Sequence, residues 1–429
     1  MRILYINDAT SSSNWGDRAS STSLRQRIAE AGGDVVFAFT ERQLIRVEFG
    51  AQLASHDQPR SSRWREAVHG LTPPVAARLG TRIWRRFGPA VGKRLVPIRW
   101  ADFSRAADNV LRKDGPWSGL LHALERVDAV LIHGDGSMVG NGMHPRVMLV
   151  IAYVAIEHFG LPVSIVNHTA DFSHPLLLEM AEHVYPRLHD VVFRDPISVE
   201  RCASFCRGRY VPDTAFSYAP ADRDAWLSVV GRRGYFDVWP DVARFDPDRP
   251  YVCVGGSSLL GSREVIEIRR QYARLLEHLR DIYGGQIVLT ASDLVDERIF
   301  RPLAATLDMP LIGVRTPVQQ AVDLLGQADA YIGGRWHPSI FAARGGTPFV
   351  ALSGKTFKMQ AIAQAAGLPA SPHDALRVGD QREAITSELM VLLAAGTTLR
   401  ERLRRWGEEQ ASRSVGHVAG LATKETVDS

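Results

Sequence analysis

The segment from Ala330 to Lys358 constrains the fold more than any other part of the chain. A short apolar run, Ala330–Ile332, has the length of a buried strand and ends at two glycines. Arg335 and His337 follow, and Pro338 then stands at a typical first helical position. The pattern predicts a strand-to-helix turn whose cationic side chains lie beside a helix N-terminus, where free N–H groups attract anions. The alternative is an ordinary connection whose Arg and His make surface contacts.

The same alternation of strand and helix patterns runs through most of the chain. Each predicted strand is followed by a helical pattern, which is typical of parallel sheets covered by helices. The predicted strands are Arg2–Ile6, Val35–Phe39, Ala129–His133, Val163–Val166, Val191–Phe193, Tyr251–Val254, Gln286–Thr290, Leu311–Gly313, Ala330–Ile332 and Pro348–Leu352. We therefore expect an α/β protein with two doubly wound, Rossmann-like domains that face each other across a cleft.

The domain boundaries follow from where this pattern lapses. The 429 residues are enough for two separate cores. Residues 221–250 are polar and rich in Pro and Gly, which indicates a linker. We expect an N-terminal domain over 1–220 with a basic insertion at about 50–115, and a C-terminal domain over 251–395. A charged terminal helix and tail would occupy 396–429.

The basic insertion has an unusual charge balance. Residues 60–114 hold thirteen Lys/Arg against four Asp/Glu, an excess of nine in a chain whose net charge is +4. Apolar residues such as Trp84, Phe87 and Trp100 are interleaved with these charges. The pattern is compatible with contact to an anionic membrane, or with a helical insertion that packs on its own domain. Nucleic acid is a weaker third alternative, so we expect no nucleic-acid partner.

Several features indicate a cytoplasmic protein. The three cysteines form no disulfide framework, and we expect Cys202 and Cys206 to pack in the interior. The N-terminus has the pattern of a strand and lacks the features of a signal peptide. The apolar run Val147–Ile156 is about half of a membrane span and predicts a buried helix.

Glycines, cations and small polar residues follow several predicted strands. Because ligands of open parallel sheets bind at the carboxyl ends of the strands, these residues predict a site for an anionic small molecule. An arginine can hold a carboxylate or phosphate by two hydrogen bonds. The predicted substrate-binding positions are Asn14, Gly16, Gly134, Gly136, Ser137, His168, Arg194, Gly255, Ser257, Ser258, Gly334 and Arg335.

Two residues are candidates for proton transfer. His337 has an arginine two positions before it, and histidine commonly acts as a general acid or base. Asp17 ends the polar loop after the first strand, before a helix that is predicted to begin near Ser20, and it is a candidate general base or a helix cap. His133 and His168 each follow or extend a strand and would line the cleft or make structural hydrogen bonds. No spacing of Cys, His or Asp supports a metal site, and Walker A, GxSxG and GxGxxG patterns are absent.

Taken together, these motifs resemble those of the polysaccharide pyruvyl transferases. The resemblance extends over roughly residues 1–20 and 128–370. Its most specific part is the segment Gly333-Gly334-Arg335-x-His337 with Lys358 downstream. The remaining motifs are Asn14-x-Gly16-Asp17, Gly134–Ser137, Arg194-Asp195-x-x-Ser198 and Asp213-x-x-Phe216. Asp135 departs from the family's glycine-only run, and Trp336 and Pro338 depart from its usual turn.

The resemblance implies a glycosyltransferase-B-like architecture and a reaction. Such enzymes transfer the enolpyruvyl group of phosphoenolpyruvate to hydroxyls of a sugar, commonly as a ketal. Arg194, Arg335 and Lys358 would bind the anionic donor and His337 would be the general acid. The donor would bind on the C-terminal domain and a glycan or lipid-linked acceptor on the N-terminal domain. Phosphoenolpyruvate is a substrate here, and no cofactor is expected.

Two other functions remain open from the sequence. The first is a glycosyltransferase of the same architecture with a nucleotide-sugar donor. The second is a non-catalytic member of the family that acts as a scaffold in polysaccharide assembly. The predicted location is the cytoplasm, with peripheral contact to the inner face of the membrane if residues 60–114 bind lipid.

Overall fold

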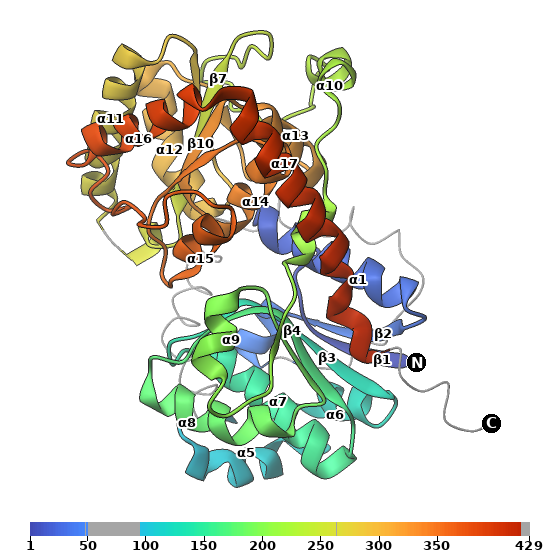
Figure 1. The fold of residues 1–429 in the computed structure, drawn as a ribbon. Coiled ribbons are helices and arrows are strands. Elements are labelled where there is room, and N and C mark those ends of the chain that lie inside the picture. Colours follow the sequence, from blue (N-terminus) through green and yellow to red (C-terminus); the bar gives the residue numbers. More distant parts are fainter. Residues whose placement is uncertain (48, 50–94, 263, 422–429) are drawn as a thin grey trace, which may run out of the picture.

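The computed structural model describes residues 1–47, 49, 95–262 and 264–421, and these form two α/β domains stacked one above the other (Figure 1). The sheet of the N-terminal domain has six parallel strands in the order β2-β1-β3-β4-β5-β6. These strands are β1 (Arg2–Asp8), β2 (Asp34–Thr40), β3 (Ala129–Val139), β4 (Val163–Asp171), β5 (Asp190–Phe193) and β6 (Arg209–Tyr210). The chain order reverses between β1 and β3, which is where doubly wound sheets bind ligands.

The C-terminal domain repeats this plan with five parallel strands in the order β11-β10-β7-β8-β9. They are β7 (Tyr251–Ser257), β8 (Gln286–Thr290), β9 (Leu311–Ile312), β10 (Ala330–Gly334) and β11 (Phe349–Ala351). Here the chain order reverses between β7 and β10. The predicted architecture of two doubly wound domains is thus confirmed, and both reversal points face the space between the domains.

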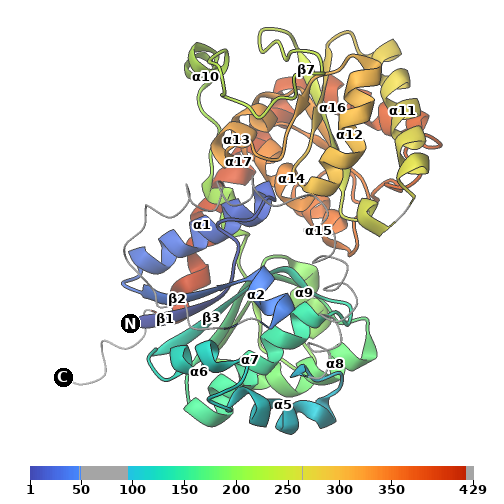
Figure 2. The ribbon, with the colours of Figure 1, turned by 180° about the vertical axis from the view of Figure 1, so that it is seen from behind.

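Helices cover both faces of each sheet (Figures 1 and 2). In the N-terminal domain they are α1 (Trp15–Glu30), α2 (Glu41–Arg46), α5 (Phe103–Val110), α6 (Ser118–Leu124), α7 (Met143–Phe159), α8 (Pro175–Val184) and α9 (Pro196–Cys202). Those that follow are α10 (Arg223–Val230), α11 (Val265–Ile282), α12 (Leu294–Leu307), α13 (Val318–Gln327), α14 (Trp336–Arg344), α15 (Lys358–Ala365), α16 (Arg382–Ala394) and α17 (Gly396–Arg413).

The apolar run Val147–Ile156 lies in α7, where most of its residues are fully buried, as predicted. Cys202 and Cys206 are buried in the same core and are free thiols, which confirms their expected packing role. Among the described residues, no helix is both long and apolar enough to cross a membrane.

The predicted linker packs on the C-terminal domain. Trp226 of α10 is fully buried against Phe245 and Tyr251, and the chain at Val238 forms a bridge to Ile312 beside the second sheet. Helix α17 then runs from the C-terminal domain down to the N-terminal domain (Figure 1). The 3₁₀ segment Ser414–Leu421 ends there, with Val418 in a small cluster around the first sheet. The chain therefore links the two domains at two places.

The basic insertion is described only from residue 95 onward, so the prediction for 60–94 lies outside the described residues. The described part packs on its own domain. Val96 and Phe103 are buried, and Trp100 stacks on His183 of α8. Arg146 of α7 donates a hydrogen bond of 2.9 Å to the Pro97 carbonyl. For residues 95–114, intramolecular packing is therefore the correct alternative.

Three predicted boundaries beside the cleft are wrong. The predicted loop Gly134–Ser137 belongs to β3, which continues to pair with β4 beyond an irregularity after Asp135. The predicted loop at Gly255 likewise lies in β7. Helix α1 begins at Trp15 and not near Ser20. The Asn14 side chain caps it by accepting hydrogen bonds from the Gly16 and Asp17 N–H groups in its first turn.

Candidate active site

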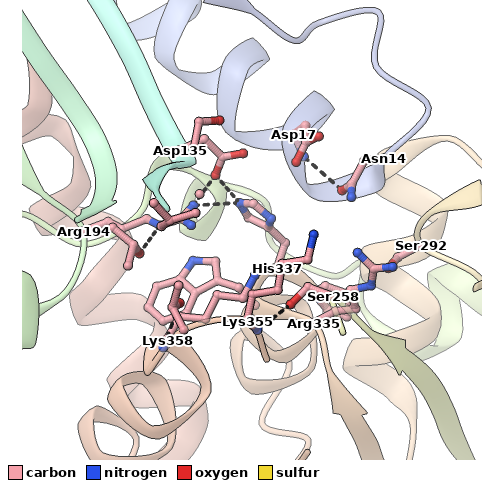
Figure 3. A pocket seen from close by; sticks show the side chains of 17 residues that line it. Asn14, Asp17, Asp135, Arg194, Ser258, Ser292, Arg335, His337, Lys355 and Lys358 are labelled. Carbon is pink, nitrogen blue, oxygen red and sulfur yellow. Dashed lines mark hydrogen bonds and ion pairs between the residues drawn. The ribbon is translucent and has the colours of Figure 1, made fainter. Parts of the chain in front are cut away.

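A cavity of about 260 Å³ lies between the two domains at the point where both sheets reverse their chain order. Helix α1 reaches across to the C-terminal domain beside it, with the Trp15 indole N–H donating to the Val314 carbonyl at 3.1 Å. The cavity is lined by Asn14, Asp17, Asp135, Gly136, Ser137, Val139, Thr169, Arg194, Ser258, Ser292, Arg335, Trp336, His337, Pro338, Lys355, Thr356 and Lys358. Figure 3 shows these side chains.

Most of the predicted site residues meet in this cavity although they come from distant parts of the chain. The predicted positions that line it are Asn14, Asp17, Gly136, Ser137, Arg194, Ser258, Arg335, His337 and Lys358. The predicted positions that do not line it are Gly16, Gly134, His168, Gly255, Ser257 and Gly334.

Arg194 lies at the end of β5 and is almost completely buried. Its guanidinium forms ion pairs with Asp135 and with Asp213, the latter at 3.0 Å, and its Nε donates to the Thr169 hydroxyl at 3.0 Å. These two carboxylates, acting against the effect of burial, raise the pKa of Arg194. The arginine is therefore a fixed positive charge that is already balanced by two acids.

Arg335 is held in the same way within the C-terminal domain. Its Nη2 donates to Asp296 Oδ1 at 2.8 Å and its Nη1 lies 3.5 Å from Asp293 Oδ2. The Asn14 amide donates to the same Asp293 oxygen at 3.1 Å, so this carboxylate joins the two domains. Burial raises the pKa of Asp296 to about 6, and the charge of Arg335 opposes that rise.

His337 lies on the first turn of α14, which begins at Trp336 with Arg335 as its N-cap. We had predicted Pro338 as the first helical residue, but it is the third. The His337 Nε2 atom lies 3.5 Å from both Arg194 Nη1 and Asp213 Oδ2. The imidazole therefore faces a group of alternating charges contributed by the N-terminal domain (Figure 3).

Gly16 explains how the histidine fits. A Cβ atom on Gly16 would lie only 1.9 Å from His337 Nδ1. The first turn of α1 can therefore pass over the imidazole only because residue 16 has no side chain. Gly16 was predicted to bind substrate, whereas its backbone here forms one wall of the histidine pocket.

Asp17 and Asp135 lie on the same side of the cavity. One oxygen of each, together with a nitrogen of His337, lie within 4.8 Å of one another. Burial, and next the charge of Asp135, raise the pKa of Asp17 well above its usual value. For Asp135 burial acts in the same direction, but the charges of Arg194 and His337 outweigh it and lower the pKa. The pair thus favours one proton between two carboxylates.

These three side chains are spaced like the ligands of a cation, although we had predicted no metal site. Asp135 already pairs with the Arg194 guanidinium, which lies 3.5 Å from the His337 ring nitrogen. A divalent cation would therefore have to bind next to an existing positive charge, which Coulomb repulsion opposes.

Two lysines complete the cavity. Lys358 is partly buried at the start of α15, and Lys355 is exposed on the loop before it. Within the described part of the chain neither ammonium group has an ion-pair partner. Burial, together with the positive charges of Arg194 and Arg335, lowers the pKa of Lys358 to about 8. The unbalanced positive charge of the cavity is therefore on the two lysines and not on the two arginines.

His168 is a correction to the predicted site. It lies within β4 and is fully buried, with Nδ1 hydrogen-bonded to the Val192 carbonyl and Nε2 to the Tyr185 hydroxyl. Burial lowers its pKa to about 3, so it stays neutral. His133 is also fully buried and its Nε2 is hydrogen-bonded to the side-chain amide of Asn167 at 3.1 Å, so both histidines have the structural role that we left open. Gly134, Gly255, Ser257 and Gly334 are similarly inside strands, because β3, β7 and β10 extend further than predicted.

Sequence reasoning did not assign a site role to several polar residues that line the cavity or contact its arginines. Asp135 was noted only as a departure from a glycine run, and Asp213 only as part of a motif. Thr169, Ser292 and Lys355 carry no local signal, except that Ser292 follows β8 at the same edge of its sheet.

A sequence model of the family described as polysaccharide pyruvyl transferase matches residues 14–356, which include every residue that lines the cavity except Lys358. The chain belongs to this family. A search of curated individual proteins finds no match.

Solved structures of other enzymes share the fold of this pyruvyl transferase family member. Spinosyn rhamnosyltransferase SpnG complexed with thymidine diphosphate has a TM-score of 0.54 at 14% identity, covering 98% of this chain and 100% of that one. UDP-GlcNAc 2-epimerase from Neisseria meningitidis bound to UDP-GlcNAc has a TM-score of 0.57 at 12% identity, covering 99% and 100%. At such identities the likeness establishes the glycosyltransferase-B-like fold alone.

The close contact at Gly16 gives a prediction. In Gly16→Ala the new methyl group should displace the His337 ring from Arg194 and Asp213, and the overpacking should lower the free energy of unfolding by about 1–3 kcal/mol. Urea denaturation measures the stability, and a crystal structure of the variant measures the displacement.

The matched control is Gly231→Ala, because a Cβ at Gly231 meets no atom within 4 Å. It should leave both the stability and the imidazole position unchanged. An unmoved His337 ring in Gly16→Ala would contradict the assigned role of Gly16.

Proposed function

We propose that this family member transfers the enolpyruvyl group of phosphoenolpyruvate to two hydroxyls of a sugar and forms a pyruvyl ketal. The single observation that carries the proposal is the convergence of His337 and four cations from both domains on one small cavity. Phosphoenolpyruvate has a carboxylate and a phosphate on three carbons, and its size and charge suit this cavity.

The donor would be held mainly by the unpaired lysines, with the arginines as a fixed background of charge. Arg194 and Arg335 are each balanced by two carboxylates, so their net attraction for an anion is small. Lys355 and Lys358 keep their charge unbalanced among the described residues. The N-terminus of α14 adds main-chain N–H groups, because Arg335 makes no side-chain cap. Such preorganised donors would also stabilise the leaving phosphate.

His337 would act as the general acid. Protonation of donor C3 makes C2 electrophilic, and one sugar hydroxyl then adds to C2 while its proton passes to a base. A second hydroxyl displaces inorganic phosphate at C2 and gives its proton to the departing phosphate, which closes the ketal and leaves C3 as a methyl group. Asp17 is the proposed base, since a carboxylate with a raised pKa is a stronger base once it is ionised.

The acceptor would be a sugar of a surface polysaccharide or its lipid-linked precursor, bound on the side of the N-terminal domain. Gly136, Ser137 and Thr169 form that wall of the cavity. Contact of residues 60–94 with the membrane that carries such precursors remains part of this proposal.

The choice of donor can be tested by binding. Phosphoenolpyruvate should raise the melting temperature of the protein, whereas UDP, TDP and their sugars should not. At a concentration of 100 times the Kd, a ligand stabilises the folded state by about 2.7 kcal/mol. A thermal-shift series followed by assay of phosphate release with candidate glycans makes the measurement. Stabilisation by a nucleotide and not by phosphoenolpyruvate would support a glycosyltransferase, and no stabilisation by any donor would support a scaffold.

Replacement of the general acid should affect turnover more than binding. His337→Ala should lower the rate of phosphate release by about 10²- to 10⁴-fold, because proton transfer to the donor is lost. Phosphoenolpyruvate should still stabilise this variant against heat, since the lysines remain. His158→Ala, an exposed position on α7, is the control and should keep full activity. Full turnover in His337→Ala would exclude the histidine as the acid.

Donor affinity should depend on pH through Lys358. Its pKa of about 8 means that the ammonium is charged below pH 8 and loses its proton above it, so anion binding should weaken as the pH rises. If only the charged form binds, the Kd should increase by about tenfold at pH 9. The phosphate itself is already fully ionised in this range.

Lys358→Arg provides the matched variant, because a guanidinium stays charged throughout. Its Kd should change little between about pH 7.5 and pH 9, because the pKa of arginine is above about 12. Titration calorimetry in both proteins gives the comparison, and an identical pH profile in the two would remove Lys358 from donor binding.

A further inference from the structure

A second polar cavity lies at the other end of α14 and has a volume of about 460 Å³. Its walls come from the segment that connects the two domains, from the ends of α13 and α14, and from α17. Four arginines face it, namely Arg223, Arg344, Arg400 and Arg404. Only two carboxylates, Asp222 and Glu408, line it with them, so the cavity has an excess of positive charge.

None of these four arginines forms an ion pair with a described residue. Arg344 Nε donates to the Phe216 carbonyl at 3.0 Å, and Arg404 Nη2 donates to the Gly345 carbonyl at 3.3 Å. Arg400 donates to the carbonyls of Ala328 and Asp329 at 2.8 and 3.2 Å and to the Thr347 hydroxyl at 3.3 Å. Since a guanidinium has five N–H donors, most donors of the cluster have no acceptor within the described residues.

The arginines are also close enough to affect one another. Burial lowers the pKa of Arg400, Asp329 raises it, and the positive charges of Arg404 and Arg223 lower it further. Like charges gathered around one cavity destabilise the protein unless an anion balances them. This arrangement differs from the active site, where each arginine has two carboxylates.

The floor of the cavity is closely packed. Gly326 lies in the last turn of α13 and Gly345 directly follows α14, and their backbones are in direct contact, since a Cβ on Gly345 would lie 2.4 Å from Gly326 Cα. Arg344 ends α14, Arg223 begins α10, and Arg400 and Arg404 lie within α17, so all four arginines are carried by helices. A preformed site loses less conformational entropy when a ligand binds.

We propose that this cavity is a binding site for a small phosphate-bearing anion. Guanidinium groups match the geometry of phosphate oxygens, and the volume falls within the range of about 300–1,000 Å³ for small-molecule sites. The site is separate from the active site, because the nine residues of α14 place its two ends roughly 13 Å apart. This proposal does not depend on which donor substrate the active site binds.

The test uses inorganic pyrophosphate as the probe and isothermal titration calorimetry with the full chain. Arg223 and Arg404 are exposed, so Arg223→Gln/Arg404→Gln should fold normally, which its melting temperature will verify. The double variant should weaken one class of pyrophosphate site by at least tenfold. Arg405→Gln is the control, because Arg405 is an exposed neighbour on α17 that does not line the cavity.

Two results would overturn the proposal. The first is a pyrophosphate isotherm that is the same in the double variant and in the wild type, which would assign all binding to other sites. The second is the absence of saturable binding in the wild type. Crystals soaked with pyrophosphate provide an independent measurement, with density expected against Arg344 and Arg400.

Discussion

The buried ion pair between Arg194 and Asp213 holds the active site together. Both side chains are inaccessible to water, and Asp213 also accepts a hydrogen bond of 3.0 Å from the indole N–H of Trp336. Trp336 belongs to the C-terminal domain, and the guanidinium of Arg194 lies 5.1 Å from its ring centroid. One carboxylate therefore connects the end of β5 to the start of α14. Removing the charge of Arg194 would leave Asp213 buried without its arginine, and such a change commonly costs about 3–5 kcal/mol.

This arrangement determines which side chains of the cavity carry unpaired positive charge. A count of cations in the cavity suggests that the arginines bind the substrate, but each is already neutralised by its own acids. Their planar groups instead fix the positions of His337, Asp135 and Asp293. The two lysines, which have no such partners among the described residues, supply the available charge. Positioning and attraction are thus divided between two residue types with suitable chemistry.

The backbone at the edge of the first sheet is also adapted to the site. Asn7 near the end of β1, Asp135 in the second half of β3 and Asn167 in the middle of β4 all have positive φ angles. Asn and Asp tolerate this conformation better than most residues, but it is still uncommon outside glycine. At Asp135 the backbone leaves regular pairing with β4 and the carboxylate lies beside Arg194. Such conformations often occur at functional sites, where the surrounding structure holds a side chain in one position.

The sequence alone was sufficient for the class of fold and for most of the site. Alternating strand and helix patterns imply parallel sheets, and the carboxyl ends of parallel strands lie on one edge, so Arg194, Arg335 and His337 could be placed in one cleft. Local patterns failed where pairing with a neighbouring strand continued through glycines, as at Gly134 and Gly255, and where Asn14 started α1 early. They also left His168 undecided, because its burial depends on packing.

What only the tertiary structure decided is which charges are paired with which. Asp213, Asp293 and Asp296 have no spacing relationship to the arginines that they neutralise, and they approach them through the packing of separate elements. The same holds for Gly16, whose contact with His337 spans both domains. Periodicity in a sequence reports which face of an element is buried, but the distance between two side chains is set by how the elements pack. The chemistry of the site depends on those distances.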